Sequence, residues 1–159
     1  MRDTMTDKNA LIQPDRGQDA ISIHLVDKDG LDEFRKGRSE ADLPADDDDH
    51  VFTLHVHVAK DEATCHANVK EPYDLYVRTR LYAQSHTYED ILDNGICLFG
   101  DPDHVADKMF RLWEMGIRHV ACLSNFGNMK RDAVEESMRL MMEEVMPKVE
   151  ARIAQREAA

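Results

Sequence analysis

Histidines recur on two short apolar segments of this chain, and their spacing places them on one face of a strand. In "VFTLHVHV" (51–58), His55 and His57 alternate with aliphatic residues. In "AISIHLV" (20–26), His24 alternates with aliphatic residues in the same way. Successive side chains of a strand point to opposite faces. We therefore expect the aliphatic faces to pack against helices and the histidine faces to look into the mouth of a barrel or sheet.

Other residues join these histidines at or near the ends of the predicted strands. In α/β folds, ligands gather at the carboxyl ends of the strands, so polar and small residues at those ends are candidates for binding. The candidate site consists of His24, His55, His57, Gly100, Ser124 and Asn125. The convergence of these residues, rather than any one of them, predicts a site.

Two other interpretations of the histidines stay open. A histidine on a strand is often a hydrogen-bonded structural residue, and that interpretation is about as favoured as a functional one. The pair at His55 and His57 could also bind a metal, as in barrel hydrolases. No nearby carboxylate with ligand spacing completes such a site, and Cys65-His66 falls on the surface of a predicted helix. We therefore expect no metal.

Four short apolar runs, and the helical stretches between them, set the architecture. The runs contain β-branched residues and have the length of strands: 20–26, 51–58, 95–100 and 119–124. Helical patterns cover 29–40, 60–83, 102–115 and a last segment from about Arg131. The alternation predicts an α/β fold with parallel strands and right-handed crossovers. Four such units make half of an eight-unit barrel or a small open doubly wound sheet.

The third helix carries the clearest end signals, in "ICLFGDPDHVADK" (96–108). Asp101 suits the N-cap, Pro102 the first helical position and Gly116 the position just beyond the end. Backbone N–H groups at such a turn could bind a phosphate. Because Asp101 and Asp103 already place negative charge there, capping is the favoured role.

Prolines and polar segments predict where the helices end and where the folded domain begins and ends. We expect a break or new start near Pro72 in the second helix, and an end or bend of the last helix at Pro147. Residues 1–19 are predicted as a polar N-terminal tail and 149–159 as a charged C-terminal tail. The α/β domain then covers 20–148.

Composition narrows the classes of function. The 159 residues include 32 acidic and 20 basic ones, a net charge of −12, with no Lys/Arg run for nucleic acid. We see neither a secretion signal nor a stretch of membrane-spanning length, so we expect no membrane association. The three cysteines lie far apart without Cys-x-x-Cys pairing, which predicts reduced thiols in a cytoplasmic protein.

The C-terminal third resembles one known family closely in motif and spacing. The segment "LFGDPDHVADKMFRLWEMGIRHVACLSNFGNMKRDAVEESMRLMMEEVMP" (98–147) resembles the end of the bacterial luciferase-like monooxygenases. In that family a Gly-x-Pro-Asp/Glu turn, a strand, an "xFG" turn and a helix ending in "EEVMP" follow one another. Upstream, "ISIHLVDKDG" and "FTLHVHVAKDEATCHANVKEPYDLYVRTRL" resemble the fifth and sixth β/α units. The branch associated with natural-product assembly lines is the most similar.

The resemblance implies the C-terminal half of a TIM barrel that uses reduced flavin and oxygen. The cofactor would be FMN, with F420 less favoured, and the substrate a small organic molecule such as an aldehyde, a sulfonate or an assembly-line intermediate. Its implied catalytic residues are His55 and His24, and its implied cofactor contacts are His57, Gly100, Ser124 and Asn125.

The first four strands of the family's barrel have no counterpart in this sequence. A half barrel exposes its inner face and two strand edges, so we expect a homo-oligomer or a partner chain that supplies the other half. Three functions stay open: a monooxygenase subunit with a shared site, a non-catalytic half barrel that binds or stabilises a partner, and an unrelated small α/β enzyme.

Overall fold

A computed structural model of the chain describes residues 28–43, 51–79, 87–93 and 97–159. The predicted strand at 20–26, with His24, and the predicted tail at 1–19 lie outside the described residues. The elements are α1 (Lys28–Glu40), β1 (Val51–Val58), α2 (Glu62–Thr79), α3 (Tyr88–Asp93), β2 (Cys97–Gly100), α4 (Pro102–Glu114), β3 (His119–Leu123), α5 (Arg131–Leu140), the π-helical turn η3 (Met141–Val145) and α6 (Met146–Glu157).

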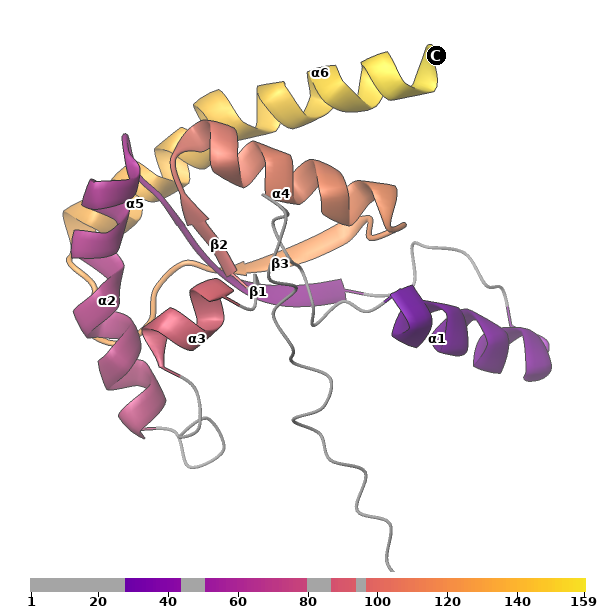
Figure 1. Cartoon of the computed structure of the whole chain (residues 1–159), viewed down its shortest axis with the longest axis horizontal. Helices are drawn as coiled ribbons and strands as arrows, with labels where there is room; N and C mark the ends of the chain where they lie inside the picture. The colour runs from indigo at the N-terminus through magenta and orange to yellow at the C-terminus, as the bar shows by residue number, and fades with distance from the viewer. Residues whose placement is uncertain (1–27, 44–50, 80–86, 94–96) are drawn as a thin grey trace, which may run out of the picture.

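The three strands form a parallel sheet in the order β2-β1-β3 (Figure 1). His55 at the centre of β1 lies opposite Cys97 of β2 and opposite Leu123 of β3. The predicted α/β class with parallel strands is confirmed. The order is a finding of the structure, because consecutive strands of a (β/α)₈ barrel are neighbours and would place β2 between the other two.

Helices cover both faces of this sheet. On one face, an aliphatic core joins the sheet to α4, η3 and α6: Leu54, Val56, Val58, Leu98, Val105, Leu112, Val145 and Val149. On the other face, α2, α3 and the segment after β3 enclose an aromatic core: Val69, Tyr73, Tyr88, Ile91, Phe99 and Phe126. The alternation of β1 therefore divides the two cores, with its aliphatic side chains on the α4 face as predicted.

The N-terminal signals of α4 work as the sequence predicts. The carboxylate of Asp101 accepts hydrogen bonds from the backbone N–H groups of Asp103 and His104, at 3.0 and 2.9 Å. Pro102 occupies the first turn, and Gly116 beyond the end has a φ of +92°. Because the Asp101 side chain takes these N–H groups, capping rather than phosphate binding is the role of this turn.

At both prolines the chain stays helical, where the sequence predicted a break near Pro72 and an end or bend at Pro147. Helix α2 runs through Pro72 without a break, although an interior proline costs about 3 kcal/mol. Buried side chains on both sides of it, Val69 and Tyr73, hold the two halves against one face of the sheet. At Pro147 the helix also continues, because the π-helical turn before it lets Met146 N–H bond to Met141 O. Residues 149–157, expected as a charged tail, belong to α6.

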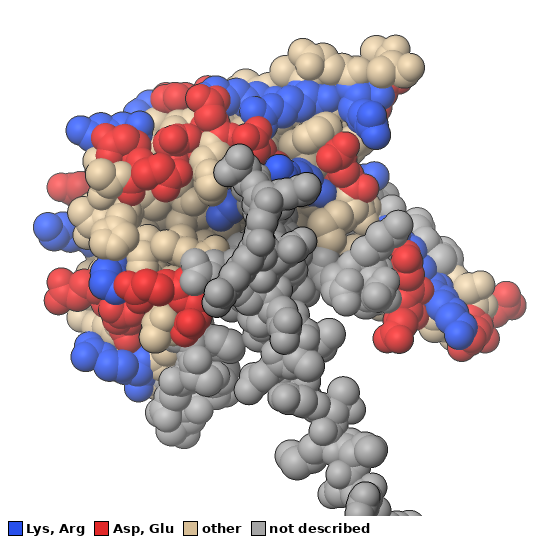
Figure 2. All heavy atoms as spheres, in the orientation of Figure 1, with Lys and Arg blue, Asp and Glu red and all other residues tan. Residues whose placement is uncertain are grey.

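Ion pairs link α6 to α4 on the outside of the molecule. Lys148, Arg152 and Arg156 of α6 pair with three acids of α4, Asp103, Asp107 and Glu114. Figure 2 shows basic side chains in a line along α6. Such exposed pairs contribute little individually, so the buried Val145 and Val149 carry most of the attachment.

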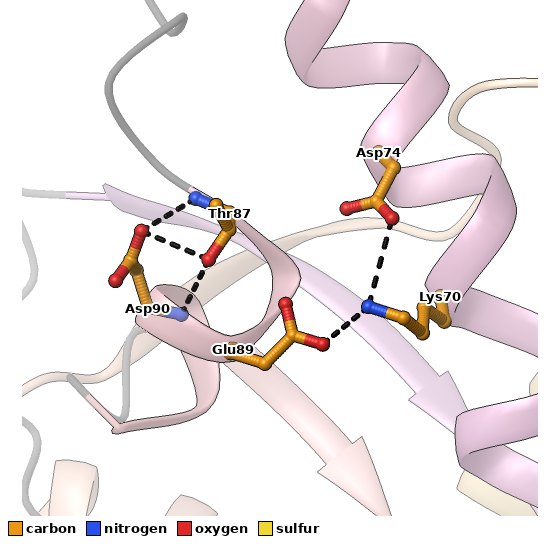
Figure 3. Close-up of polar contacts among 5 residues, drawn as sticks. All are labelled: Lys70, Asp74, Thr87, Glu89 and Asp90. Atoms are coloured by element: carbon orange, nitrogen blue, oxygen red, sulfur yellow. Dashed lines mark hydrogen bonds and ion pairs between the residues drawn. The ribbon is translucent and has the colours of Figure 1, made fainter.

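The sequence did not predict the short helix α3. Hydrogen bonds cap its first turn, and an ion pair joins it to α2 (Figure 3). The backbone N–H of Thr87 donates to Asp90 Oδ2 at 2.7 Å, and the N–H of Asp90 donates to Thr87 Oγ1 at 3.1 Å. This reciprocal capping box satisfies two backbone donors of the first turn. Lys70 of α2 pairs with Glu89 and also lies 3.7 Å from Asp74.

We expect Ser137→Ala to lower the free energy of unfolding by about 1–2 kcal/mol. The hydroxyl of Ser137 accepts a hydrogen bond from the N–H of Val58 at 2.8 Å, and both groups are buried. Alanine would leave that donor without its acceptor. Urea unfolding measures the change, and the matched control is Ser39→Ala on the exposed side of α1, expected within about 0.5 kcal/mol of wild type. Equal effects of the two substitutions would contradict a role for the hydroxyl.

Candidate functional site

His57 lies at the boundary between the sheet and α2, with none of its surface exposed. The Nδ2 amide of Asn68, on α2, lies 3.2 Å from Nε2 of His57 and can donate to it, which leaves the imidazole proton on Nδ1. Among the described residues, Nδ1 has no hydrogen-bond partner. Burial lowers the pKa of His57 to about 4, so its imidazole is neutral at pH 7.

His55 lies two residues earlier, on the same face of the sheet, within a cage of aromatic rings. Its ring makes edge contacts with Tyr73, Tyr76 and Phe126, at centroid distances of 5.4, 4.9 and 5.1 Å. Such contacts favour one orientation of the ring. The two histidines therefore share a face, as predicted; α2 buries His57, whereas His55 stays partly exposed.

The remaining predicted residues occupy the carboxyl ends of different strands. Gly100 ends β2 with a φ of +148°, and its carbonyl accepts the N–H of Ala59 at 3.0 Å. Ser124 follows β3 and lines a hollow of about 170 Å³ on the opposite face from the histidines, beside Val56. Asn125 is exposed. The structure thus brings His55 and His57 together, and it separates Ser124 from them by the sheet.

Acidic and capping residues surround the carboxyl end of the sheet. Asp61 accepts the N–H of Thr64 at 2.7 Å at the start of α2, as Asp101 does for α4. Glu62 lies 3.8 Å from Nδ1 of His104, and both side chains reach solvent. A Cβ atom on Gly100 would come within 2.8 Å of the Glu62 carboxylate, so these side chains close around the strand end.

A groove of about 240 Å³ lies beside this edge, between α2 and the residues that lead into α5. It is lined by Asn68, Glu71, Pro72, Asn128 and Lys130 among others. Lys130, the residue before α5, makes no side-chain cap. Because one lysine and one glutamate line the groove, it carries no clear preference for an anion.

The cysteines show no sign of reactivity. Burial raises the pKa of Cys65 to about 12 and that of Cys97 to about 11, which keeps both as thiols. Cys122 is exposed, and partial desolvation raises its pKa as well. In the described part of the chain, no group of three or more His, Cys, Asp or Glu side chains is placed to hold a metal ion.

Sequence reasoning missed the side chains that define the environment of the histidines. Asn68, Tyr73 and Tyr76 all come from α2, whose buried residues repeat at helical spacing. That spacing indicates which face of α2 is buried, but it does not say which face of the sheet it meets. Asn68 has no sequence signal of its own, because the burial of its neighbour Val69 is known only from the structure.

No family model matches the chain, and no curated protein matches it. Solved structures do. The monooxygenase RslO1 from Streptomyces bottropensis is similar over 76% of this chain and 37% of its own, with 18% identity and a TM-score of 0.59. A type II Baeyer–Villiger monooxygenase is similar over 77% of this chain and 40% of its own, with 22% identity and a TM-score of 0.60.

The second structure is the oxygenating constituent of 3,6-diketocamphane monooxygenase from the CAM plasmid of Pseudomonas putida, in complex with FMN. The chain spans about two fifths of the length of each of these proteins. At these identities the similarity shows a shared fold: an α/β unit with the architecture of part of a monooxygenase.

The described carboxyl edge fits one portion of FMN better than the other. The exposed amide of Asn125 could hydrogen-bond to a flavin ring, whereas the carbonyl of Gly100 already accepts the N–H of Ala59. The side chains at this edge that a phosphate would meet, Asp61, Glu62 and Asp101, are acidic rather than basic. The N-termini of α2 and α4 are already capped by Asp61 and Asp101. The residues described here therefore do not fit the phosphate group.

Proposed function

We propose that this chain is one part of a flavin-dependent monooxygenase, whose site it shares with another chain or another copy. The observation that carries the proposal is the similarity of three quarters of the chain to two fifths of two monooxygenases, one of them with FMN bound. Reduced FMN would supply the electrons for oxygenating a small organic substrate. The remaining three fifths of such a unit then come from the partner.

In this proposal the chain contributes the ring side of the flavin site and the partner contributes the phosphate side. The exposed Asn125 binds the ring from the carboxyl edge. The acidic residues at that edge disfavour a phosphate, so the positively charged side chain that binds the phosphate must come from the partner. His55 and His24 remain the proposed catalytic residues. The neutral His57 serves beneath His55 as a fixed, uncharged part of the floor.

A second candidate function is a non-catalytic subunit that stabilises a partner. It is favoured by one observation: α2 buries His57 completely, and the rings of Tyr76 and Phe126 pack against the partly exposed His55. A chain of this kind would keep the architecture while withholding the buried His57 from a substrate. It differs from the first candidate in binding no flavin.

Equilibrium dialysis of the full chain against reduced riboflavin and reduced FMN, under anaerobic conditions, distinguishes the two. We expect both ligands to bind with a Kd on the order of 100 μM, within about threefold of each other, because the phosphate gains nothing here. Asn125→Ala should weaken both about fivefold through the loss of a hydrogen bond. The matched control is Asn128→Ala, an exposed amide in the same segment, which should leave both unchanged.

Three results would count against this assignment. If neither ligand bound at about 1 mM, the non-catalytic function would replace the proposed one. If FMN bound tenfold or more tightly than riboflavin, the division of the flavin between two chains would be wrong. Equal losses from Asn125→Ala and Asn128→Ala would remove Asn125 from the site.

A further inference from the structure

Two adjoining hollows lie on the α4 face of the sheet, opposite His55 and His57. The larger has a volume of about 390 Å³ and lies between β3, α4, η3 and α6, and the smaller has a volume of about 170 Å³. Cys122, Met141 and Met142 line both hollows, which therefore form one continuous groove, the α4 groove. Because the side chain of Met142 is 67% exposed, the groove is open to solvent.

The α4 groove follows β3 along its length. Arg118, just before the strand, lines the larger hollow, and Ser124, just after it, lines the smaller one. Val120 and Cys122 line the groove between them, at alternate positions that share one face of the strand. The five residues of β3 rise about 16 Å, which is roughly the length of an extended chain of about 12 carbons. The groove is thus long and narrow, with different residues at its two ends.

Arg118 gives one end of the groove a positive charge, and Trp113 holds it in place. Nη1 of Arg118 donates to the carbonyl of Trp113 at 2.6 Å, and the guanidinium carbon lies 5.0 Å from the centroid of the indole ring. A guanidinium has five N–H groups, so this contact leaves donors for a ligand. Although the chain has a net charge of −12, no aspartate or glutamate is among the described residues that line either hollow.

We propose that the α4 groove binds a free long-chain carboxylate of about 12 carbons, with its head on Arg118 and its aliphatic chain along β3 toward Ser124. The single cation at one end matches a single anionic head. A polypeptide segment would bring backbone N–H and C=O groups that the apolar lining does not satisfy, whereas a hydrocarbon chain brings none. Flexible methionines such as Met141 and Met142 adapt their shape to such a chain.

Titration of the full chain with sodium dodecanoate tests the site through the fluorescence of Trp113, the only tryptophan in the sequence and part of the groove lining. We expect a Kd on the order of 10 μM. Octanoate should bind at least about 30-fold more weakly, since each buried methylene strengthens binding about fourfold. Dodecyltrimethylammonium should bind at least about tenfold more weakly than dodecanoate, because its cationic head cannot accept a hydrogen bond from Arg118. The net charge of the protein alone would favour that cation.

Two substitutions locate the head and the chain of the ligand, and calorimetry measures them because Arg118 contacts the reporting indole. Arg118→Gln should weaken dodecanoate about tenfold through the loss of a charge-assisted hydrogen bond. Its matched control is Arg78→Gln at the exposed end of α2, which should leave binding unchanged. Met142→Asp should also weaken dodecanoate at least about tenfold, since it places an acid between the two hollows. The exposed Met142 tolerates the change, and Leu43→Asp, at a side chain 52% exposed in α1's C-terminal turn, is its control.

Alkylation of Cys122 gives a second measure of occupancy. Cys122 is exposed and lines both hollows, whereas Cys65 and Cys97 are buried. Dodecanoate at ten times its Kd should slow the reaction of Cys122 with iodoacetamide about tenfold, because only about a tenth of the sites stay empty. Octanoate at the same concentration should leave the rate nearly unchanged.

The contrary outcomes each overturn the proposal. If dodecanoate did not bind at about 1 mM, the groove would have another occupant. Equal affinity for dodecanoate and dodecyltrimethylammonium would show that Arg118 does not select the head. Binding that left Cys122 fully reactive, or that Met142→Asp did not weaken, would place the ligand elsewhere on the protein. These results are independent of flavin binding, which dialysis against riboflavin and FMN measures separately.

Discussion

Gly127→Ala is expected to lower the free energy of unfolding by about 3 kcal/mol. A Cβ atom on Gly127 would lie 2.0 Å from the backbone oxygen of Pro72 and 2.7 Å from its carbonyl carbon. The φ of +57° costs an alanine only about 1 kcal/mol, so the clash is the larger effect. The clashing atoms belong to the backbone of α2, which Val69 and Tyr73 fix to the sheet. They cannot rotate away as a side chain would.

The segment after β3 must therefore move, and it carries Phe126 with it. The ring of Phe126 is 3% exposed and stacks on Phe99 at a centroid distance of 5.7 Å. We expect urea unfolding to show the loss of stability and near-ultraviolet circular dichroism to show a changed aromatic environment. The control is Gly37→Ala in α1, where no atom lies within 4 Å of the added Cβ. It should raise stability by up to about 1 kcal/mol. Similar effects of both substitutions would contradict the close approach at Pro72.

Elements whose signals lie within a few residues were predictable from the sequence. Helix α4 begins at Pro102 because Asp101 caps it, and both residues are adjacent in the chain. Strand β1 has the predicted limits of 51–58, since its alternation is complete within eight residues. The common face of His55 and His57 follows from the same local rule.

Features that depend on distant contacts were not predictable. The continuity of α2 through Pro72 depends on buried neighbours that meet the sheet, and local preference alone predicted a break. The central place of β1 depends on β3 pairing with the edge of β1 opposite β2, which no residue pattern states. For the candidate site, the sequence could place His55 on a face, but Tyr73 and Tyr76 decide whether that face is open.

The buried histidine predicts how stability responds to acid. The pKa of His57 is lowered from 6.5 to about 4 because burial disfavours the charged imidazolium. Below pH 6.5 the unfolded chain binds a proton at this residue that the folded protein does not bind. Folding stability from this group is complete above pH 6.5 and is lost as the pH falls toward 4. The slope is about 1.4 kcal/mol per pH unit and the total about 3 kcal/mol.

Urea unfolding between pH 4.5 and 7.5 isolates this contribution when His57→Gln is compared with wild type. Glutamine keeps a polar group for Asn68 but does not titrate, so its stability should decline less steeply, by about one bound proton. Asn68→Leu is the informative control. It removes the hydrogen bond and should lower stability at every pH, yet it should keep the wild-type slope because burial, rather than that bond, causes the shift. Parallel curves for wild type and His57→Gln would show that this imidazole is not held neutral by the fold.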